Sequence, residues 1–228
     1  MKLRLVFTLF ILLVAGLAGA GAGAGRTYRT DFARTENPLS EHGNWEGGKT
    51  VGLDWADVAC AQGLAYGLEP GPTGYDDATA LLTGEWGPDQ TAEATVHYIR
   101  PNDRINEEVE LRLRSALSPH RATGYEVLFS CSKTARSYTE IVRWNGLLGD
   151  FTYIDRHSGS SFGVADGDVV KATAKGNVIT AYVNGVQVAR AMDHTYPTGH
   201  PGIGFFIGQA TGANRDYGFT RFKATDEP

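Results

Sequence analysis

Cysteine and excess positive charge are both scarce in this sequence. Only Cys60 and Cys131 occur among 228 residues, and neither a C-x-x-C motif nor the usual Cys/His spacing of zinc sites is present. Lys and Arg number 21 against 26 Asp and Glu, which gives a formal net charge of -5. Nucleic-acid-binding domains usually carry a basic stripe, so this composition argues against nucleic acid as a partner.

A helical hydrophobic period and an internal boundary are also missing. No window sustains the 3.6-residue repeat of an amphipathic helix, and no Pro/Ser-rich linker, block of like charges or internal repeat divides the chain. Glycine, by contrast, is frequent, with 29 residues spread through the sequence as turn punctuation. These features predict a single domain over residues 26–228.

Residues 1–25 have the composition of a secretory signal peptide. Lys2 and Arg4 precede an apolar segment from Leu5 to about Leu17, and the Ala/Gly run that follows offers A-x-A cleavage sites. The apolar segment is shorter than the roughly 20 residues that a membrane-spanning helix needs. We therefore expect a secreted protein, extracellular or periplasmic, with no membrane span after cleavage.

Short β-strands are the dominant pattern of the remaining chain. Asn184-Gly185 lies between two alternating runs, and Asn-Gly is the preferred pair of the type I′ turn that joins adjacent antiparallel strands. With a second turn at Gly176-Asn177, residues 168–191 predict a three-stranded meander. Many antiparallel strands must each bury one face, which predicts an all-β fold of two packed sheets. The expected strands, rich in β-branched and aromatic residues, are 91–99, 107–114, 124–131, 138–144, 169–175, 178–183, 186–191, 202–208 and 217–222.

Several longer motifs occur in an informative order. DFARTENPLSEHGNW near the start is followed by IVRWNGLLGDFTYI, by the strand–Asn-Gly–strand unit, by TGHPGIGFF and by a closing DYGFTRF. Over nearly all of residues 31–224 the chain thus resembles the concanavalin A-like jelly-roll superfamily, in particular its laminin G-like and laminarinase-like secreted bacterial domains. The resemblance implies an antiparallel two-sheet jelly-roll sandwich. It also implies a poly- or oligosaccharide partner on the concave face of one sheet.

The strand EVELRLRS alternates apolar and charged residues and carries the candidate catalytic residues. Laminarinase-type hydrolases have Glu-x-Asp-x-(x-)Glu on one strand, which places two carboxylates on one face at the roughly 5 Å that a retaining mechanism requires. Here Glu108 and Glu110 hold the first two positions, but Arg112 stands where the second Glu is expected. Glu110-Leu111-Arg112 also matches only half of the Arg-x-Glu-x-Arg strand of jelly-roll alginate lyases. Neither activity carries over from the motif, and Glu108 and Glu110 remain candidate catalytic residues.

Five residues are candidates for contact with a sugar, because sugars stack on flat rings and accept hydrogen bonds from charged and amide groups. Trp144 lies beside Arg143 near the end of a strand, where its ring can form a groove rim; the alternative is a core tryptophan. The alternative for the charged strand is a solvated sheet face, whose ion pairs contribute about 0 to 1 kcal/mol each. The candidates are Glu110, Arg112, Arg143, Trp144 and Tyr138.

The resemblance also indicates a calcium site. In laminarinase-like jelly rolls a structural Ca²⁺ is held by an Asp at the start of the last strand and by backbone carbonyls near the N-terminus. Asp216 matches the first position, and backbone oxygens near Asp31 and Gly48 could complete a shell of the oxygen ligands that Ca²⁺ takes. The alternative is a turn Asp that caps its own loop.

The two cysteines leave two alternatives open. Cys60 and Cys131 could pair, because disulfides persist in an oxidising compartment. Otherwise they are small buried hydrophobes on separate strands.

Taken together, the sequence predicts a secreted jelly roll that binds carbohydrate. A polysaccharide-cleaving enzyme of the same fold, a glycoside hydrolase before a lyase, is the alternative. A structural or adhesive extracellular domain is the third interpretation.

Overall fold

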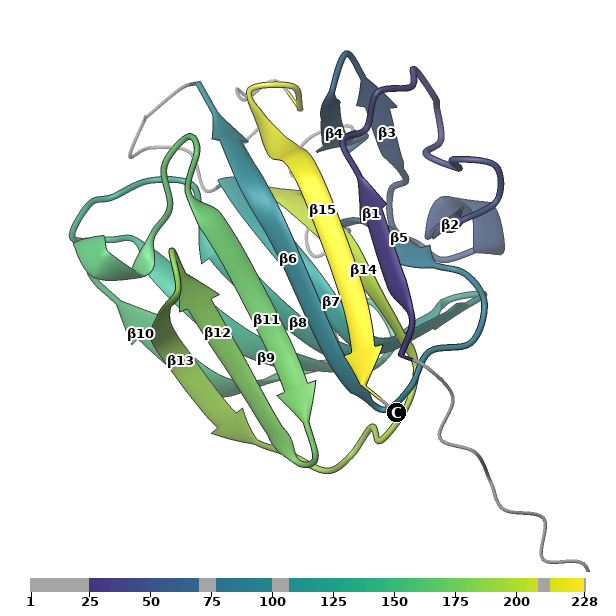
Figure 1. Cartoon of the computed structure of the whole chain (residues 1–228). Coiled ribbons are helices and arrows are strands. Elements are labelled where there is room, and N and C mark those ends of the chain that lie inside the picture. The colour runs from purple at the N-terminus through teal and green to yellow at the C-terminus, as the bar shows by residue number, and fades with distance from the viewer. Residues whose placement is uncertain (1–24, 70–76, 100–106, 209–213, 228) are drawn as a thin grey trace, which may run out of the picture.

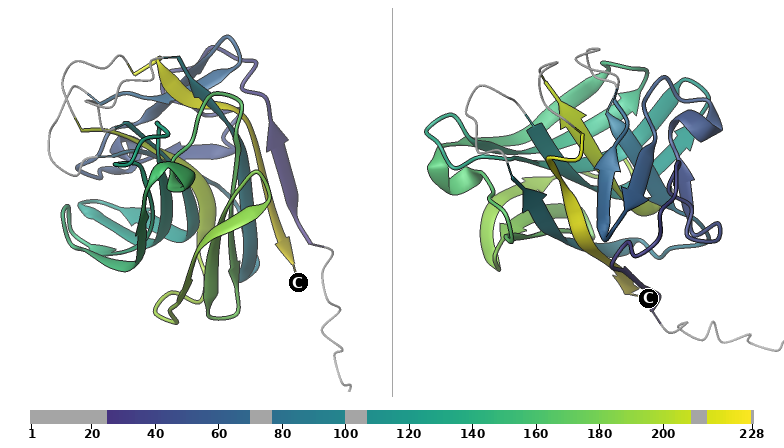
Figure 2. Two further views of the ribbon diagram at one scale, coloured as in Figure 1. Left: turned by 90° about the vertical axis from the view of Figure 1, so that its left-hand side faces the viewer. Right: turned by 90° about the horizontal axis from the view of Figure 1, so that it is seen from above.

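The computed structural model of the protein describes residues 25–69, 77–99, 107–208 and 214–227. Within these ranges the chain forms two antiparallel sheets packed face to face (Figures 1 and 2). Sheet A has the strand order β13-β12-β11-β6-β15-β4-β3, with β1 paired to β15, and sheet B has the order β10-β9-β8-β7-β14-β5-β2. The predicted all-β jelly-roll sandwich is confirmed.

The strands of each sheet come from distant parts of the chain. Sheet A contains β1 (Thr27–Thr30), β3 (Val58–Ala61), β4 (Leu64–Gly67), β6 (Asp89–Tyr98), β11 (Val169–Lys175), β12 (Val178–Val183), β13 (Val186–Met192) and β15 (Tyr217–Glu227). Sheet B contains β2 (Trp45–Gly47), β5 (Ala78–Leu82), β7 (Glu107–Ser118), β8 (Arg121–Ser130), β9 (Tyr138–Gly146), β10 (Phe151–Ser158) and β14 (His200–Ile207). Two short 3₁₀ turns are η1 (Lys49–Val51) and η2 (Ser160–Phe162).

All nine predicted strands are present, as β6–β9 and β11–β15. Asn184 and Gly185 have φ angles of 49° and 81°, as the type I′ turn requires at both central positions, and β11, β12 and β13 form the predicted meander. The strands that the sequence did not predict are β1–β5, which have three to five residues each, and the half-exposed β10. Such strands are too short or too polar to show a clear two-residue period.

Side-chain alternation places the core between the sheets. On β7 the side chains of Val109, Leu111 and Leu113 have no exposed surface and pack in one apolar cluster with Val96 and Phe219 of sheet A. Because successive residues of a strand point to opposite faces, the residues between them are turned to the face of sheet B that points away from sheet A. This face is called the outer face of sheet B below.

The two cysteines are free thiols in the structure. Cys60 lies on β3 of sheet A, whereas Cys131 directly follows β8 of sheet B, and both are buried. Burial raises the pKa of the Cys60 thiol to about 11 and that of Cys131 well above its usual range. The pairing alternative is therefore not realised in the structure, where Cys60 is a small buried side chain on β3 and Cys131 is one just after the end of β8.

No helix within the described residues is long and apolar enough to cross a membrane. The predicted signal peptide, residues 1–25, lies outside the described residues except for its last position.

Candidate functional site

The outer face of sheet B carries polar, aromatic and aliphatic side chains, whereas its inner face packs into the core between the sheets. On β8, Glu126 and Leu128 alternate with the core residues Tyr125, Val127 and Phe129. On β9, the corresponding set is Tyr138, Glu140, Val142 and Trp144. Both rows follow directly from the two-residue period of their strands.

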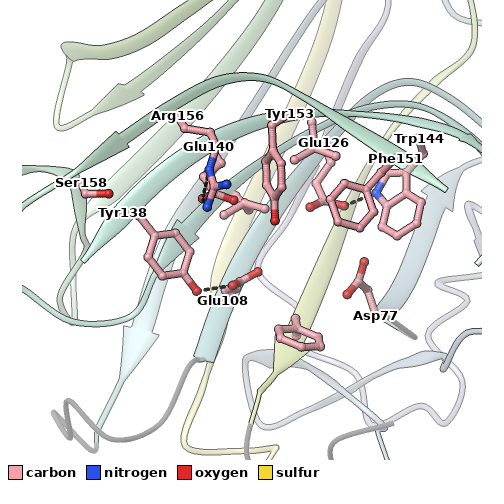
Figure 3. Close-up of a pocket in the computed structure, with 13 residues that line it drawn as sticks. Asp77, Glu108, Glu126, Tyr138, Glu140, Trp144, Phe151, Tyr153, Arg156 and Ser158 are labelled. Carbon is pink, nitrogen blue, oxygen red and sulfur yellow. Dashed lines mark hydrogen bonds and ion pairs between the residues drawn. The ribbon is translucent and has the colours of Figure 1, made fainter. Parts of the chain in front are cut away.

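These rows line a pocket of about 300 Å³ over β7–β10, called the β7–β10 pocket below (Figure 3). Phe206 of β14 and Asp77, which directly precedes β5, close its other side. The lining described by the structure includes five aromatic rings, four carboxyl groups and a single guanidinium. Its residues are Asp77, Glu108, Glu126, Leu128, Tyr138, Glu140, Val142, Trp144, Phe151, Tyr153, Arg156, Ser158 and Phe206.

Glu108 is the carboxyl group of β7 that reaches the pocket. Its Oε1 accepts a hydrogen bond from the Tyr138 hydroxyl. The pKa of Glu108 is raised to about 8, mainly by desolvation. The charges of Glu126 and Glu140 contribute to this rise, and the Tyr138 hydrogen bond opposes it. Burial and the same carboxyl raise the pKa of Tyr138. Glu108 thus holds its proton at neutral pH.

Glu140 and Arg156 form an ion pair on the β9–β10 side of the pocket. The Arg156 Nε donates to Glu140 Oε1 at 2.8 Å, and its guanidinium lies 3.8 Å from the centre of the Tyr153 ring. Burial raises the pKa of Glu140 even though Arg156 opposes it. The guanidinium of Arg156 is already matched by this carboxyl and adds little free positive charge to the pocket.

Arg112 lies beneath the pocket inside a cluster of three carboxyl groups. Its guanidinium is 3.3 Å from Asp77 and 2.5 Å from Glu110, and it also donates to Glu126. Desolvation raises the pKa of both Asp77 and Glu110, and neighbouring carboxylates raise it further. Arg112 is 3% exposed and Glu110 is 0% exposed. These two residues therefore form neither the expected groove surface nor the alternative, a solvated sheet face.

Two neighbours make room for this cluster and cover it. Gly204 of β14 pairs with Glu110 of β7, and a Cβ at Gly204 would lie 2.2 Å from the Glu110 carboxylate, so any larger residue there would displace the Glu110 side chain. The Trp55 ring lies 5.0 Å from the Arg112 guanidinium, which is the arrangement of a cation–π contact. Glu110 and Arg112 are therefore sealed below the pocket surface.

The same cluster does not have the form of a metal centre. Asp77, Glu110 and Glu126 each offer a carboxylate oxygen within 4.8 Å of the others, a spacing that could hold a cation. The Arg112 guanidinium, however, contacts all three carboxylates and supplies the positive charge itself. A metal ion would have to displace a buried guanidinium.

The sequence left two alternatives for Trp144, a ring at the groove rim and a core tryptophan, and the structure has features of both. It lines the pocket, but it is only 4% exposed and packs edge-on against Trp55 with ring centres 4.4 Å apart. Its indole Nε1 donates to Glu126 at 2.5 Å, and Phe151 lies 5.1 Å away. Trp144 is thus a packed pocket wall and not a free rim.

Comparisons with known proteins bear on the fold. No protein-family model matches the chain, and no curated protein matches it. Among solved structures, the carbohydrate-binding module CBM66 from Bacillus subtilis superposes with a TM-score of 0.51 at 16% identity, over 83% of this chain and 96% of that one. The Ca²⁺- and Man-bound exoplasmic/lumenal domain of VIP36 gives 0.55 at 12% identity, over 82% and 86%. Porphyranase B from Zobellia galactanivorans gives 0.51 at 8% identity, over 89% and 93%.

The chain has the concanavalin A-like jelly-roll fold. Its structural neighbours include carbohydrate-binding modules, lectin domains and glycan-cleaving enzymes. Because the identities are this low and one fold hosts many functions, the likeness establishes the architecture and leaves the activity to be argued from the site.

Arg143 of this jelly roll does not share the site with the other predicted residues. It neighbours Trp144 on β9 and therefore points to the opposite face. Its Nη1 donates to Asp193 at 2.5 Å and to Thr195 at 3.0 Å. Arg143 ties the loop after β13 to sheet B, and its expected place at the groove edge is wrong for this reason.

The predicted calcium ligands do not converge either. Thr30, the last residue of β1, pairs with Phe222 of β15, six residues (222 − 216) from Asp216, and Asp31 directly follows it. Continued by one residue, the same register would bring Asp31 level with Arg221, five residues (221 − 216) from Asp216. At about 3.3 Å per residue this separates them by roughly 16 Å. Gly48 belongs to the sheet B side, where its N–H donates to Thr79 of β5 at 2.8 Å. Calcium at the buried Asp216 stays a prediction, and it needs ligands other than Asp31.

The structure therefore unites the predicted residues Glu108, Tyr138 and Trp144 in the pocket and adds residues that sequence reasoning missed. Glu126 and Glu140 are the acidic residues of β8 and β9, and the two-residue period of each strand places them opposite the core-facing residues. Asp77, Tyr153 and Arg156 come from weakly patterned segments, and only the folded arrangement brings them to the site.

Proposed function

We propose that the protein is secreted and binds a poly- or oligosaccharide in the β7–β10 pocket. The observation that carries this proposal is the joint lining of the pocket by aromatic rings and hydrogen-bonding carboxyl groups. Tyr153 is 42% exposed and is held against Arg156, so a sugar ring can stack on it without a rearrangement. The carboxyl groups of Glu108 and Glu140 offer acceptors and donors for hydroxyl groups beneath it.

The fold supports the same proposal. Clefts lined by aromatic side chains with a few convergent polar groups are the usual form of small-ligand sites. The pocket lies on the outer face of sheet B, and the resemblance implies a glycan on the concave face of one sheet.

A panel of oligosaccharides tests the proposal with two matched tyrosine variants. Tyr153→Ala should bind the panel's ligand about tenfold or more weakly, which corresponds to about 1.4 kcal/mol. Tyr182→Ala is the control, because Tyr182 is on β12 of sheet A and should leave the affinity unchanged. Equal affinities of the two variants, or no binding by the wild type at all, would remove the pocket as a glycan site and favour a structural or adhesive role.

Glycoside hydrolysis is the second candidate, and one observation favours it. A general acid must be protonated at working pH, and burial raises the pKa of Glu108 to about 8. The retaining and inverting mechanisms both need a second carboxylate facing the first, and Glu126 or Glu140 can serve. Glu110, the partner expected from the sequence, lies below the pocket instead.

Release of reducing ends separates hydrolysis from binding. If the protein is an enzyme, Glu108→Gln should abolish release while leaving binding intact. Glu85→Gln is the control, since Glu85 is exposed between β5 and β6. Release that survives Glu108→Gln would contradict the assigned role of this carboxyl.

A further inference from the structure

The charge of the β7–β10 pocket and of the cluster below it is unbalanced. Five carboxyl groups meet there, and two guanidiniums accompany them within the described residues. Arg112 is shared by Asp77, Glu110 and Glu126, and Arg156 is matched by Glu140. Among the residues that the structure describes, Glu108 accepts a hydrogen bond from the neutral Tyr138 hydroxyl and forms no ion pair with a guanidinium.

Individual atoms show the same deficit of positive charge. The Oε1 atom of the fully buried Glu110 has no hydrogen-bond partner within the described part of the chain. Burial and mutual repulsion raise the pKa of Asp77, Glu108, Glu110 and Glu140. Carboxyl groups in such surroundings either keep protons or attract a cation from outside.

We propose that the β7–β10 pocket selects glycans that carry a protonated amine, and that the ammonium group binds at Glu108. This inference rests on the proposed glycan-binding function. An ammonium group has three hydrogen-bond donors and one positive charge, which suits Glu108 flanked by Glu126 and Glu140. Figure 3 shows Glu108 on the pocket floor between Tyr138 and Asp77, open to the space under the Tyr153 ring.

Acidic glycans are excluded by the same arrangement. A uronate or sulfate group in the pocket would face the carboxyl groups of Asp77, Glu108, Glu126 and Glu140, with the single lining guanidinium already bound to Glu140. Those of the carboxyl groups that are ionised repel such an anion, and those that keep their protons supply no positive charge to attract it.

Binding of the amine should release a proton from Glu108. In the free protein at pH 6, Glu108 is a neutral carboxylic acid because burial raises its pKa to about 8. The bound ammonium favours the carboxylate, so Glu108 loses its proton to the buffer while the amine keeps its own. We expect release of up to about one proton per glycan bound.

The test compares four tetrasaccharides by calorimetry at pH 6: glucosamine, N-acetylglucosamine, glucose and uronate. The glucosamine tetramer should bind about tenfold or more tightly than its N-acetylated counterpart, and the uronate should bind weakest. Binding heats measured in two buffers of different ionisation enthalpy should show proton release for the glucosamine tetramer and none for the glucose tetramer.

Variants then assign the effect to one carboxyl. Glu108→Gln should reduce the preference for the amine to about threefold or less, whereas Glu85→Gln should retain it. Should Glu108→Gln fail to fold, the wild-type calorimetry decides alone.

The outcomes separate this inference from the function on which it rests. Binding of the neutral or uronate tetramers as tightly as glucosamine, or amine binding without proton release, overturns the amine selectivity and leaves glycan binding standing. Failure of all four tetramers to bind contradicts both.

Discussion

Replacement of Arg112 by methionine tests the buried charge cluster under the pocket. The guanidinium is 3% exposed and contacts Asp77, Glu110 and Glu126, so its loss leaves three buried carboxyl groups without their cation. Removal of one partner from a buried ion pair costs about 3 to 5 kcal/mol. For a domain of about 200 residues this corresponds to a fall in melting temperature of roughly 6 to 20 °C.

The pH dependence of the stability lost in Arg112→Met shows whether Arg112 stabilises the fold by its charge or by its packing. Protonated carboxyl groups no longer need a cation, so the destabilisation by Arg112→Met should be smaller at pH 5 than at pH 8. A second change, Glu110→Gln in the Arg112→Met background, should recover part of the stability because it removes one unpaired charge. Urea unfolding at both pH values measures these free energies.

Arg190→Met is the control for the same chemical change. Arg190 is exposed on β13, and its replacement should alter stability by about 0.5 kcal/mol or less. A loss at Arg112→Met no larger than this control, or equal at pH 5 and pH 8, would refute the account of Arg112 as the buried counter-ion.

Three further predictions concern single side chains. Trp144→Ala should cost about 3 to 5 kcal/mol in urea unfolding, whereas the exposed Tyr153→Ala should cost about 1 kcal/mol or less; similar losses would contradict their different burial. The folded state raises the pKa of Glu108 to about 8 from an unfolded value near 4.3, so it binds more protons, and the unfolding free energy should fall as pH rises from about 5 to 8. Glu108→Gln should flatten that slope, and an unchanged slope would assign it to other groups. Thiol titration without reductant should find two reactive cysteines after denaturation and protected ones in the native protein; no thiols in denaturant would reveal a disulfide.

The local part of this structure was predictable from sequence because it depends on neighbouring residues. The Asn184-Gly185 turn specifies the meander of β11, β12 and β13. The alternation of β7 decides which of its side chains point away from the core. The two-residue period of β7 and of β9 turns Glu108 and Tyr138 to the outer face of sheet B, where both line the pocket.

The remaining part depends on contacts between distant segments. Glu110 and Arg112 were expected at a groove, but Asp77 and Trp55 cover them from segments 35 and 57 residues away from Arg112 (112 − 77 and 112 − 55). A register shift between Leu113 and Ala116 interrupts the alternation, and Arg114 takes a φ of 48° and donates to Pro88 instead. No local sequence pattern indicates these contacts of Arg112 and Arg114 with distant segments.

The indole N–H resonances of the tryptophans give the most direct test of the claim that the β7–β10 pocket is the glycan site. Trp144 lines the pocket and donates to Glu126, whereas the indoles of Trp45 and Trp86 donate elsewhere, to Tyr28 and Thr83. Titration of ¹⁵N-labelled protein with its bound oligosaccharide should shift the Trp144 indole signal and leave those of Trp45 and Trp86 in place. A shift of Trp45 or Trp86 with Trp144 unmoved would contradict the account and place the glycan on another surface.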